Sequence, residues 1–260
     1  MKKGVLIVSF GTSYREAEAQ NIIPVEQAIS AALPDYEMQR AYGSRRIIKK
    51  LKERDGICIN TVSEALETLA AAGCKELIVQ PTHILDGIEN NIMKEDVLSY
   101  KEEFQSIVFG APLLSSEKDS QAIIHAISEE FPDLASKDAL VLMGHGTAHH
   151  VNVVYSSLNK AFKSMGYSNF FLGTVEAEPT VQDLVTEVED FQPDKIVLTP
   201  FMIVAGDHAH NDMAGTEPDS WLHQFRQMNE NVCPILKGLG EYPGIRSMFI
   251  EHIQDAMTQL

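Results

Sequence analysis

The stretch ALVLMGHGTAHH at residues 139–150 indicates the fold class of the chain. Its first part is apolar throughout, without polar alternation, which is typical of a strand covered on both faces. Gly144 and Gly146 then allow a sharp turn around His145. We therefore predict a buried parallel strand here, with His145 projecting from its carboxyl end.

Similar apolar runs alternate with helical patterns along the whole chain. Strands are predicted over residues 4–10, 36–43, 76–84, 106–112, 139–146, 169–176, 195–204 and 233–239. Helical spacing is found over residues 16–32, 61–73, 90–105, 116–130, 151–165, 179–190 and 243–258. This alternation predicts an α/β fold with parallel sheets and right-handed crossovers, flanked by helices.

The sequence also contains a weak internal repeat. VLIVSFGTSYRE (5–16) resembles LVLMGHGTAHH (140–150), and LIVQPTHILDGIE (77–89) resembles IVLTPFMIVAGDH (196–208). The second alignment places Glu89 over His208. The repeat predicts two similar Rossmann-like halves, residues 1–125 and 126–260, with the C-terminal helix able to pack back on the first half. A ligand is expected at the carboxyl ends of the strands, in the cleft between the halves.

Composition excludes several classes of protein. The net charge of −16 disfavours binding to nucleic acid or to anionic membranes. Three widely spaced cysteines do not indicate a disulfide framework. The apolar run near the N-terminus is too short for a signal peptide, and no run reaches the roughly 20 residues of a membrane helix. We expect a cytoplasmic protein.

Three side chains outline a metal site. The segment IVAGDHAHND (203–212) supplies His208 and His210, and TVEAEPT (174–180) supplies Glu176. His145, Glu176 and His208 each follow a different predicted strand, and a parallel sheet brings such strand ends together. Imidazole and carboxylate together suit a divalent first-row metal such as Co²⁺, Fe²⁺, Ni²⁺ or Zn²⁺.

Other catalytic motifs are missing from the sequence. It has no GxxxxGK[ST] loop, no GxGxxG after a strand, no HExxH helix and no GxSxG elbow. We therefore expect no nucleotide cofactor. Thr12 and Ser13 stand where a helix start can bind an anionic group through backbone N–H donors.

At these residues the chain resembles the anaerobic cobalt chelatases of cobalamin synthesis. These are the CbiK-type sirohydrochlorin cobaltochelatases of the class II tetrapyrrole chelatase superfamily. The matching blocks are VSFGTSY (8–14), RDGI (54–57), QPTHILDG (80–87), APLLSS (111–116), MGHGTAHH (143–150), VEAEP (175–179), MIVAGDHAHNDMAG (202–215), DSW (219–221) and GLGE (238–241). The resemblance implies two α/β halves with the tetrapyrrole between them.

The resemblance also implies roles for individual residues. The family's two histidines and glutamate carry over to His145, Glu176 and His208, which would hold the metal. His145 is our choice for the main proton acceptor, with Glu176 offsetting charge as protons leave. The implied reaction is ATP-independent insertion of Co²⁺ into sirohydrochlorin, or its precorrin-2 form, with release of two protons.

Substrate binding is predicted on the first half. The loop of Phe10, Gly11, Thr12 and Ser13, together with His83 and Glu89, is expected to contact the tetrapyrrole. The family's serine-histidine pair reads Thr82-His83 here. Because sirohydrochlorin is a polycarboxylate and the chain is acidic, a local basic patch is required, and the densest cluster follows residue 44. Arg45 and Arg46 are predicted to bind carboxylates, whereas Lys49 and Lys50 are interpreted as a solvated helix face.

Alternatives remain open at this stage. An iron or nickel chelatase acting on a related tetrapyrrole would use the same ligands, since a His/Glu site has no intrinsic preference for cobalt. A non-catalytic tetrapyrrole or metal carrier would bind without turnover, and a metal-dependent hydrolase would use the ligands to activate water. The cellular metal, homo-oligomer formation and haem binding are not indicated by the sequence.

Overall fold

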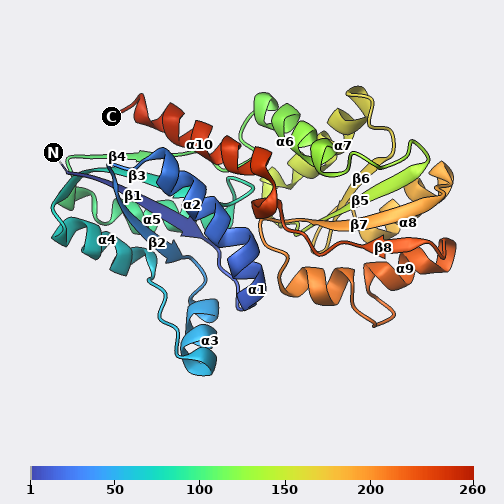
Figure 1. The fold of residues 1–260 in the computed structure, drawn as a ribbon, viewed down its shortest axis with the longest axis horizontal. Helices are drawn as coiled ribbons and strands as arrows, with labels where there is room; N and C mark the ends of the chain where they lie inside the picture. The colour runs from blue at the N-terminus through green and yellow to red at the C-terminus, as the bar shows by residue number, and fades with distance from the viewer. Residues whose placement is uncertain (1) are drawn as a thin grey trace. The chain divides into compact units, whose positions relative to one another are not determined.

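The computed structural model describes residues 2–260 and divides the chain into two α/β units (Figure 1). Unit 1 comprises the chain up to Asp119 together with Pro243–Leu260, and unit 2 comprises Ser120–Tyr242. The division differs from the boundary drawn after residue 125. It falls inside the helix Glu117–Glu130. Residues 243–260 belong to unit 1, the half on which the C-terminal helix was expected to be able to pack.

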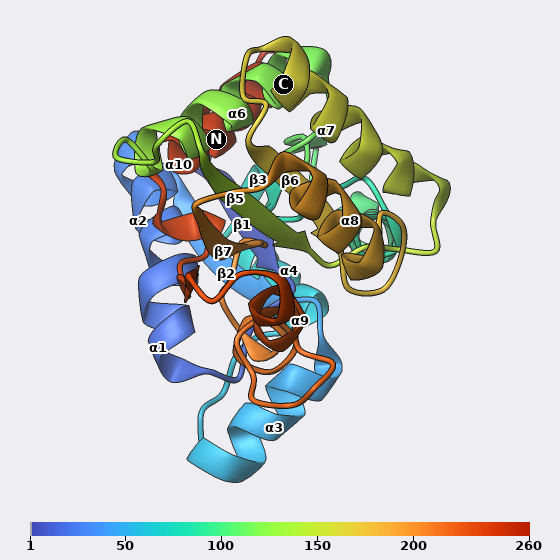
Figure 2. The same cartoon turned by 90° about the vertical axis from the view of Figure 1, so that its right-hand side faces the viewer.

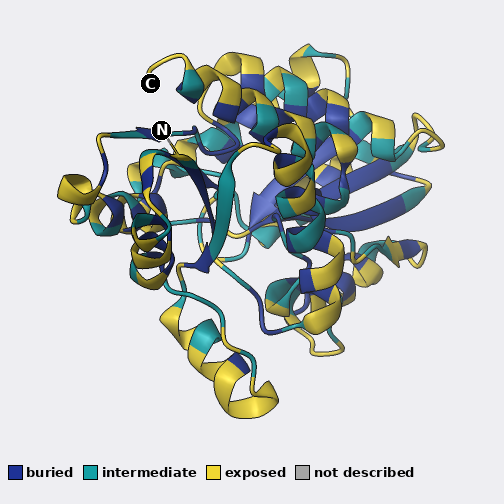
Figure 3. Ribbon diagram, turned by 60° about the vertical axis from the view of Figure 1, so that its left-hand side comes forward, coloured by how far each residue is buried: buried dark blue, intermediate teal, exposed yellow. Residues whose placement is uncertain are grey.

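Unit 1 is built on a parallel sheet of four strands in the order β2-β1-β3-β4. The strands are β1 (Lys2–Ser9), β2 (Glu37–Tyr42), β3 (Cys74–Pro81) and β4 (Ser106–Phe109). Leu6 and Val8 face one apolar core with Leu66 of the helix Val62–Ala71, whereas Val5 and Ile7, also fully buried, alternate to the other face. Both faces are therefore covered, as the uninterrupted apolar runs predict (Figure 3).

Helical segments of unit 1 surround this sheet, and one of them, α3, extends away from it (Figure 1). They are α1 (Arg15–Ala17), the π-helix η1 (Glu18–Ile22), α2 (Ile23–Ala32), α3 (Arg45–Asp55), α4 (Val62–Ala71), α5 (Ile88–Leu98), the 3₁₀ turn η2 (Lys101–Glu103) and α10 (Pro243–Met257). α10 packs on α2, β3 and β4. Its His252 is buried, with Nε2 2.9 Å from Asp119 Oδ1 and Nδ1 3.0 Å from the carbonyl oxygen of Ala111.

Unit 2 repeats this architecture with strand order β6-β5-β7-β8, again all parallel. The strands are β5 (Asp138–Gly144), β6 (Phe170–Thr174), β7 (Lys195–Phe201) and β8 (Val232–Pro234). The helices are α6 (Glu117–Glu130), η3 (His150–Asn152), α7 (Val153–Ser164), α8 (Val181–Phe191), the π-helix η4 (Ala209–Met213), α9 (Trp221–Met228) and η5 (Leu239–Glu241). The two Rossmann-like sheets expected from the repeat are thus confirmed.

The register of the strands aligns the two units residue by residue. Val8 pairs with Pro81 in unit 1, and Met143 pairs with Pro200 in unit 2. The equivalent positions are therefore Val8 and Met143, Ser9 and Gly144, Tyr42 and Thr174, and Pro81 and Pro200. The weak sequence repeat thus reflects a structural repeat that extends to the strand ends.

Unit 1 contains a network of buried charges beside β2. Glu18 is 4% exposed and accepts hydrogen bonds from Arg40 at 3.0 Å and from the hydroxyl of Tyr42 at 3.1 Å. Arg40 also forms an ion pair with Glu26 at 3.0 Å. Burial, opposed by the charge of Arg40 and reinforced by that of Glu18, raises the pKa of Glu26 to about 7. One arginine thus lies between two carboxyl groups, one of which holds a proton near neutral pH.

Two helices, α3 and α9, lie outside the helical ranges predicted from the sequence, although Lys49 and Lys50 of α3 were interpreted as a helix face. Each begins at a serine whose hydroxyl accepts a backbone hydrogen bond: Ser44 from Ile47 and Ser220 from His223. α3 ends at Gly56 with φ of 69°, a left-handed cap. Within residues 2–260, no helix is long and apolar enough to cross a membrane.

Candidate metal centre

His145 is the first residue after β5, and its loop is fixed by Gly146. Gly146 has φ of 83°, and a Cβ atom there would lie 2.8 Å from Thr174 Oγ1 and 2.9 Å from the backbone nitrogen of Ala177. The backbone therefore turns in a conformation that favours glycine and presses against the loop after β6. The His145 side chain is 47% exposed, so the turn presents the imidazole at the surface of unit 2.

Glu176 reaches the same place from the end of β6. The parallel pairing continues past the strands, because Val175 N–H donates to the carbonyl of Gly144 at 3.0 Å and Glu176 N–H donates to that of His145 at 2.9 Å. Asn152 joins the two loops further on: it accepts from the backbone of Thr147 and donates to the carbonyl of Glu178. The backbone positions of both functional residues are thus set by hydrogen bonds.

His208 comes from the loop after β7 and caps the π-helix η4 at its N-terminus. Its Nδ1 lies 2.6 Å from Asp212 Oδ2, one turn further along the chain. The wider turn of a π-helix is a local irregularity that is frequent at functional sites. Here the turn brings the carboxylate of Asp212 back to the imidazole of His208.

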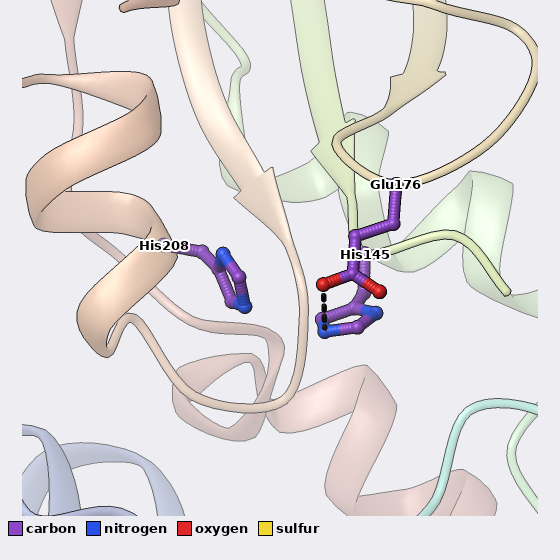
Figure 4. Close-up of side chains that lie close together, drawn as sticks. All are labelled: His145, Glu176 and His208. Atoms are coloured by element: carbon purple, nitrogen blue, oxygen red, sulfur yellow. Dashed lines mark ion pairs between the residues drawn. The ribbon is translucent and has the colours of Figure 1, made fainter.

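The three side chains form one cluster, which we call the His–Glu–His cluster (Figure 4). One ligand atom from each of His145, Glu176 and His208 lies within 4.8 Å of the others. His145 Nε2 is 3.8 Å from Glu176 Oε1. The two imidazole rings meet edge to face, with centroids 4.7 Å apart and planes at 88°.

Hydrogen bonds orient both histidines in the same way. The Nδ1 atom of His145 lies 2.8 Å from the carbonyl oxygen of Gly146, and that of His208 faces the carboxylate of Asp212. Since these oxygens accept hydrogen bonds, each Nδ1 carries the hydrogen and each Nε2 keeps a lone pair. Both rings thus offer Nε2 as a metal ligand or a proton acceptor.

The spacing of the cluster suits a metal that is held by few protein atoms. Bonds of about 2.1 Å place two ligands of one ion roughly 3–3.5 Å apart, close to the 3.8 Å between His145 and Glu176. His208 is one-third exposed and Glu176 is more than half exposed. The cluster therefore supplies three protein ligands and leaves positions for water or for another ligand, as catalytic metal sites do.

The predicted substrate loop of unit 1 lies at the end of β1, the position equivalent to the His145 loop. Phe10 is 47% exposed, and Gly11 has φ of 99°. A Cβ atom at Gly11 would collide with the ring of Tyr42. Thr12 and Ser13 are buried, and the Thr12 hydroxyl accepts from the backbone N–H of Tyr14 at 3.1 Å. Phe10 is thus the member of this loop that presents its side chain to solvent.

The other predicted substrate residues also lie near strand ends of unit 1. Arg45 and Arg46 are exposed in the first turn of α3, after β2. His83 and Glu89 follow β3, with Glu89 exposed in the first turn of α5. Burial lowers the pKa of His83, and a hydrogen-bonding contact with Asn90 at 3.3 Å partly opposes this shift. His83 is therefore a neutral, half-buried side chain, and the arginines and Glu89 face solvent.

Sequence reasoning did not assign a role to Asp212 or Asn152. Asp212 lies four residues after His208, a spacing that places two side chains on one face of a helical turn. That spacing was a usable signal. For Asn152 the sequence held no such signal, because its partners, Thr147 and Glu178, lie on two different loops.

Fold and cluster together describe an α/β protein with two Rossmann-like units and, at the strand ends of the second, three side chains close enough together to share a divalent metal. The family model for cobalt chelatase (CbiK) matches residues 3–258. The chain belongs to this cobalt chelatase family.

Two relatives agree with this assignment. The sirohydrochlorin cobaltochelatase of Salmonella typhimurium is 38% identical over 99% of this chain and 97% of its own length. The sirohydrochlorin cobaltochelatase CbiKC of Nitratidesulfovibrio vulgaris is 27% identical over 100% of this chain and 92% of its own.

The two structures share the fold. SirB from Bacillus subtilis with Fe³⁺ superposes with a TM-score of 0.69 at 16% identity, over 98% of this chain and 96% of SirB. The sirohydrochlorin chelatase SirB from Bacillus subtilis subspecies spizizenii in complex with cobalt gives 0.69 at 15% identity, over 100% and 97%. At these identities the likeness establishes the fold.

Proposed function

We propose that this protein is a sirohydrochlorin cobaltochelatase. It inserts Co²⁺ into sirohydrochlorin without ATP and releases two protons. The observation that carries the proposal is the His–Glu–His cluster, in which one ligand atom from each of two imidazoles and a carboxylate lies within 4.8 Å of the others. Membership of the cobalt chelatase family and the names of the two relatives support the choice of substrate and metal.

Different residues of the cluster bind the metal and accept protons. Glu176 and His208 hold the metal ion, and the carboxylate balances part of its charge. His145 accepts a pyrrole proton at Nε2, because its Nδ1 already donates to the carbonyl of Gly146. General-base catalysis of this kind contributes typically about 10²–10⁴-fold to a proton transfer.

The open geometry of the cluster also suits a metal that is transferred to the substrate. A structural metal site encloses its ion in four protein ligands, whereas here Glu176 and His208 hold the ion and His145 is kept for the proton. A chelatase must give its metal away, so incomplete coordination by the protein favours transfer to the four nitrogens of the macrocycle. Cobalt is the substrate here and leaves with the product.

The experiment that tests the function is an anaerobic insertion assay. Purified protein, sirohydrochlorin and Co²⁺ are mixed, and the change in the tetrapyrrole absorbance spectrum is followed beside an enzyme-free control. Fe²⁺ and Ni²⁺ are run as competing metals. Insertion well above the control, fastest with Co²⁺, is the expected result. Binding of sirohydrochlorin with no rate above the control would overturn the proposal and leave a carrier.

A further inference from the structure

α3 concentrates positive charge in an acidic protein. Its sequence RRIIKKLKERD contains six basic residues of the 21 in the chain and two acidic ones, although the chain carries −16. The helix extends away from the sheet of unit 1 (Figures 1 and 2) and is largely exposed (Figure 3). Leu51 is its one buried residue. Packing in the core therefore does not explain its composition.

The position of the charges within α3 is unfavourable for the helix itself. Acidic residues stabilise the first turn of a helix through its dipole, and α4, α5 and α8 each have one there. α3 has none and instead begins with Arg45 and Arg46. The positive end of the helix thus coincides with two positive side chains. Such an arrangement is stabilised when an anion binds to it.

α3 is tethered to the strand ends of unit 1 at both of its own ends. At its start, Ser44 N–H donates to the carbonyl of Phe10 at 3.2 Å. At its end, Arg54 donates to the carbonyl of Ser13 at 2.6 Å. The helix therefore stands at the carboxyl edge of the sheet, which is the edge where α/β proteins bind their ligands.

One face of α3 forms a shallow basic groove. A depression of about 440 Å³ is lined by Arg46, Lys49, Lys50, Glu53 and Arg54. Within residues 2–260, the side chains of Arg46 and Lys50 form no hydrogen bond or ion pair, and that of Lys49 has a long contact of 3.8 Å to Glu53 while 74% exposed. Arg46, Lys49 and Lys50, which we call the α3 basic face, are thus available to an outside anion.

We propose that the α3 basic face captures carboxylate groups of the tetrapyrrole substrate. This inference rests on the proposed function and extends it to Lys49 and Lys50, which the sequence alone had suggested to be a solvated face. A polycarboxylate approaching a chain of charge −16 is repelled unless positive charge is focused locally. The basic side chains of the groove supply this local positive charge and can bind several carboxylates at once. The same net charge argues against nucleic acid as the ligand.

The test measures binding of metal-free sirohydrochlorin by anaerobic absorbance titration, at about 0.02 M and about 0.5 M NaCl. The variant R46Q/K49Q/K50Q is expected to raise Kd roughly tenfold at low salt, as three exposed charge contacts would. The difference should shrink to within about twofold at high salt, because exposed charges are screened. In the insertion assay, KM for sirohydrochlorin should rise in parallel with Kd.

A matched control removes the same charge elsewhere in the chain. Lys75, Lys101 and Lys137 are exposed and lie at the amino ends of strands, so K75Q/K101Q/K137Q should change Kd by less than about twofold. Glu53→Gln supplies the opposite sign: it removes a negative charge from the groove and should lower Kd at low salt. A general loss of structure would weaken binding in every variant and would not lower Kd in E53Q.

The outcomes separate this inference from the proposed function. Equal effects of the two triple variants, or wild-type binding by R46Q/K49Q/K50Q, would overturn the role of α3 even if cobalt insertion is observed. If the wild-type protein binds sirohydrochlorin but inserts no cobalt, the proposed function fails. A salt-sensitive loss of binding in R46Q/K49Q/K50Q would then still support α3 as the carboxylate-binding surface.

Discussion

The two units share one scaffold and differ at the ends of their strands. At the position of His145 unit 1 has Phe10, and at the position of Glu176 it has Ser44, two residues after the paired Tyr42 and Thr174. Both loops after the first strand turn at a glycine of positive φ, Gly11 and Gly146. The glycine turn is shared by both units, whereas the candidate metal ligands occur on unit 2.

This difference shows which positions of the fold can change without disturbing the buried strands. Strand interiors are buried on both faces and tolerate little change, but Phe10, His145 and Glu176, which follow strands, are about half exposed. Unit 2 places imidazole and carboxylate there. Unit 1 places an exposed aromatic ring there and a basic helix nearby, a surface suited to an organic ligand. Each prediction below changes one side of this comparison.

The largest effect is expected when unit 2 is given the residue of unit 1. His145→Phe removes the Nε2 lone pair, so cobalt insertion should fall by about 10²–10⁴-fold. His145 is half exposed, and the melting temperature should change little. His150→Phe, an exposed histidine of the same segment, serves as the control and should retain activity. Activity of H145F within tenfold of wild type would contradict the role of this residue.

The shared glycine turn can be tested next. Gly146→Ala should lower the free energy of unfolding by roughly 2–4 kcal/mol, because the methyl group meets backbone and the φ is positive. Gly166→Ala is matched in φ, at 93°, but its Cβ would meet nothing within 4 Å. It should cost about 1–2 kcal/mol. Urea unfolding of both variants gives the difference, and equal losses would show that contact with the β6 loop is unimportant.

Orientation of His208 should have a smaller effect. Asp212→Ala leaves the imidazole free to rotate and to exchange tautomers, so affinity for Co²⁺ should fall about 10–100-fold. Asp212→Asn keeps an oxygen that accepts from Nδ1 and should recover most of the affinity. Calorimetric titration with Co²⁺ alone measures both. Equal losses in D212A and D212N would assign the effect to the charge of Asp212 and not to orientation.

The buried charges of unit 1 predict the smallest effect, on stability. A carboxyl whose pKa rises from 4.5 to about 7 on folding binds its proton more tightly in the folded protein. Its stabilising contribution is therefore present below about pH 4.5 and is lost as the pH rises through about 7. Glu26→Gln mimics the protonated acid, so at pH 8 it should be more stable than wild type by about 1–2 kcal/mol.

The same variant should match wild type near pH 4, where Glu26 is largely protonated in both the folded and the unfolded protein. Urea unfolding at the two pH values isolates the effect, with the exposed Glu16→Gln as the control. A constant difference between E26Q and wild type at both pH values would contradict the raised pKa.

The sequence predicted most of the sheet and the outline of the site. Apolar runs without alternation located the strands, since burial on both faces leaves no room for polar residues. Parallel pairing then brought together the residues that follow them, and so His145, Glu176 and His208 could be grouped. α3 could not be found in this way, because its helix depends on the Ser44 and Gly56 caps and buries almost nothing.

Tertiary packing determined what the sequence left open. The placement of Pro243–Leu260 with unit 1 depends on contacts with α2, β3 and β4, which lie far away in the sequence. The distances within the His–Glu–His cluster depend on the π-helix after His208, which has no reliable sequence signature. The assignment of individual substrate contacts in unit 1 stays a prediction.

The return of α10 to unit 1 has a consequence for the order of events during translation. The ribosome makes α2, β3 and β4 early, but the helix that covers them follows the whole of unit 2. At 5–20 residues per second this delay is on the order of ten seconds. Unit 2 consists of one continuous stretch of the chain, so it can fold before unit 1 is complete. The surface of α2, β3 and β4 that α10 covers therefore stays uncovered in the nascent chain for that interval.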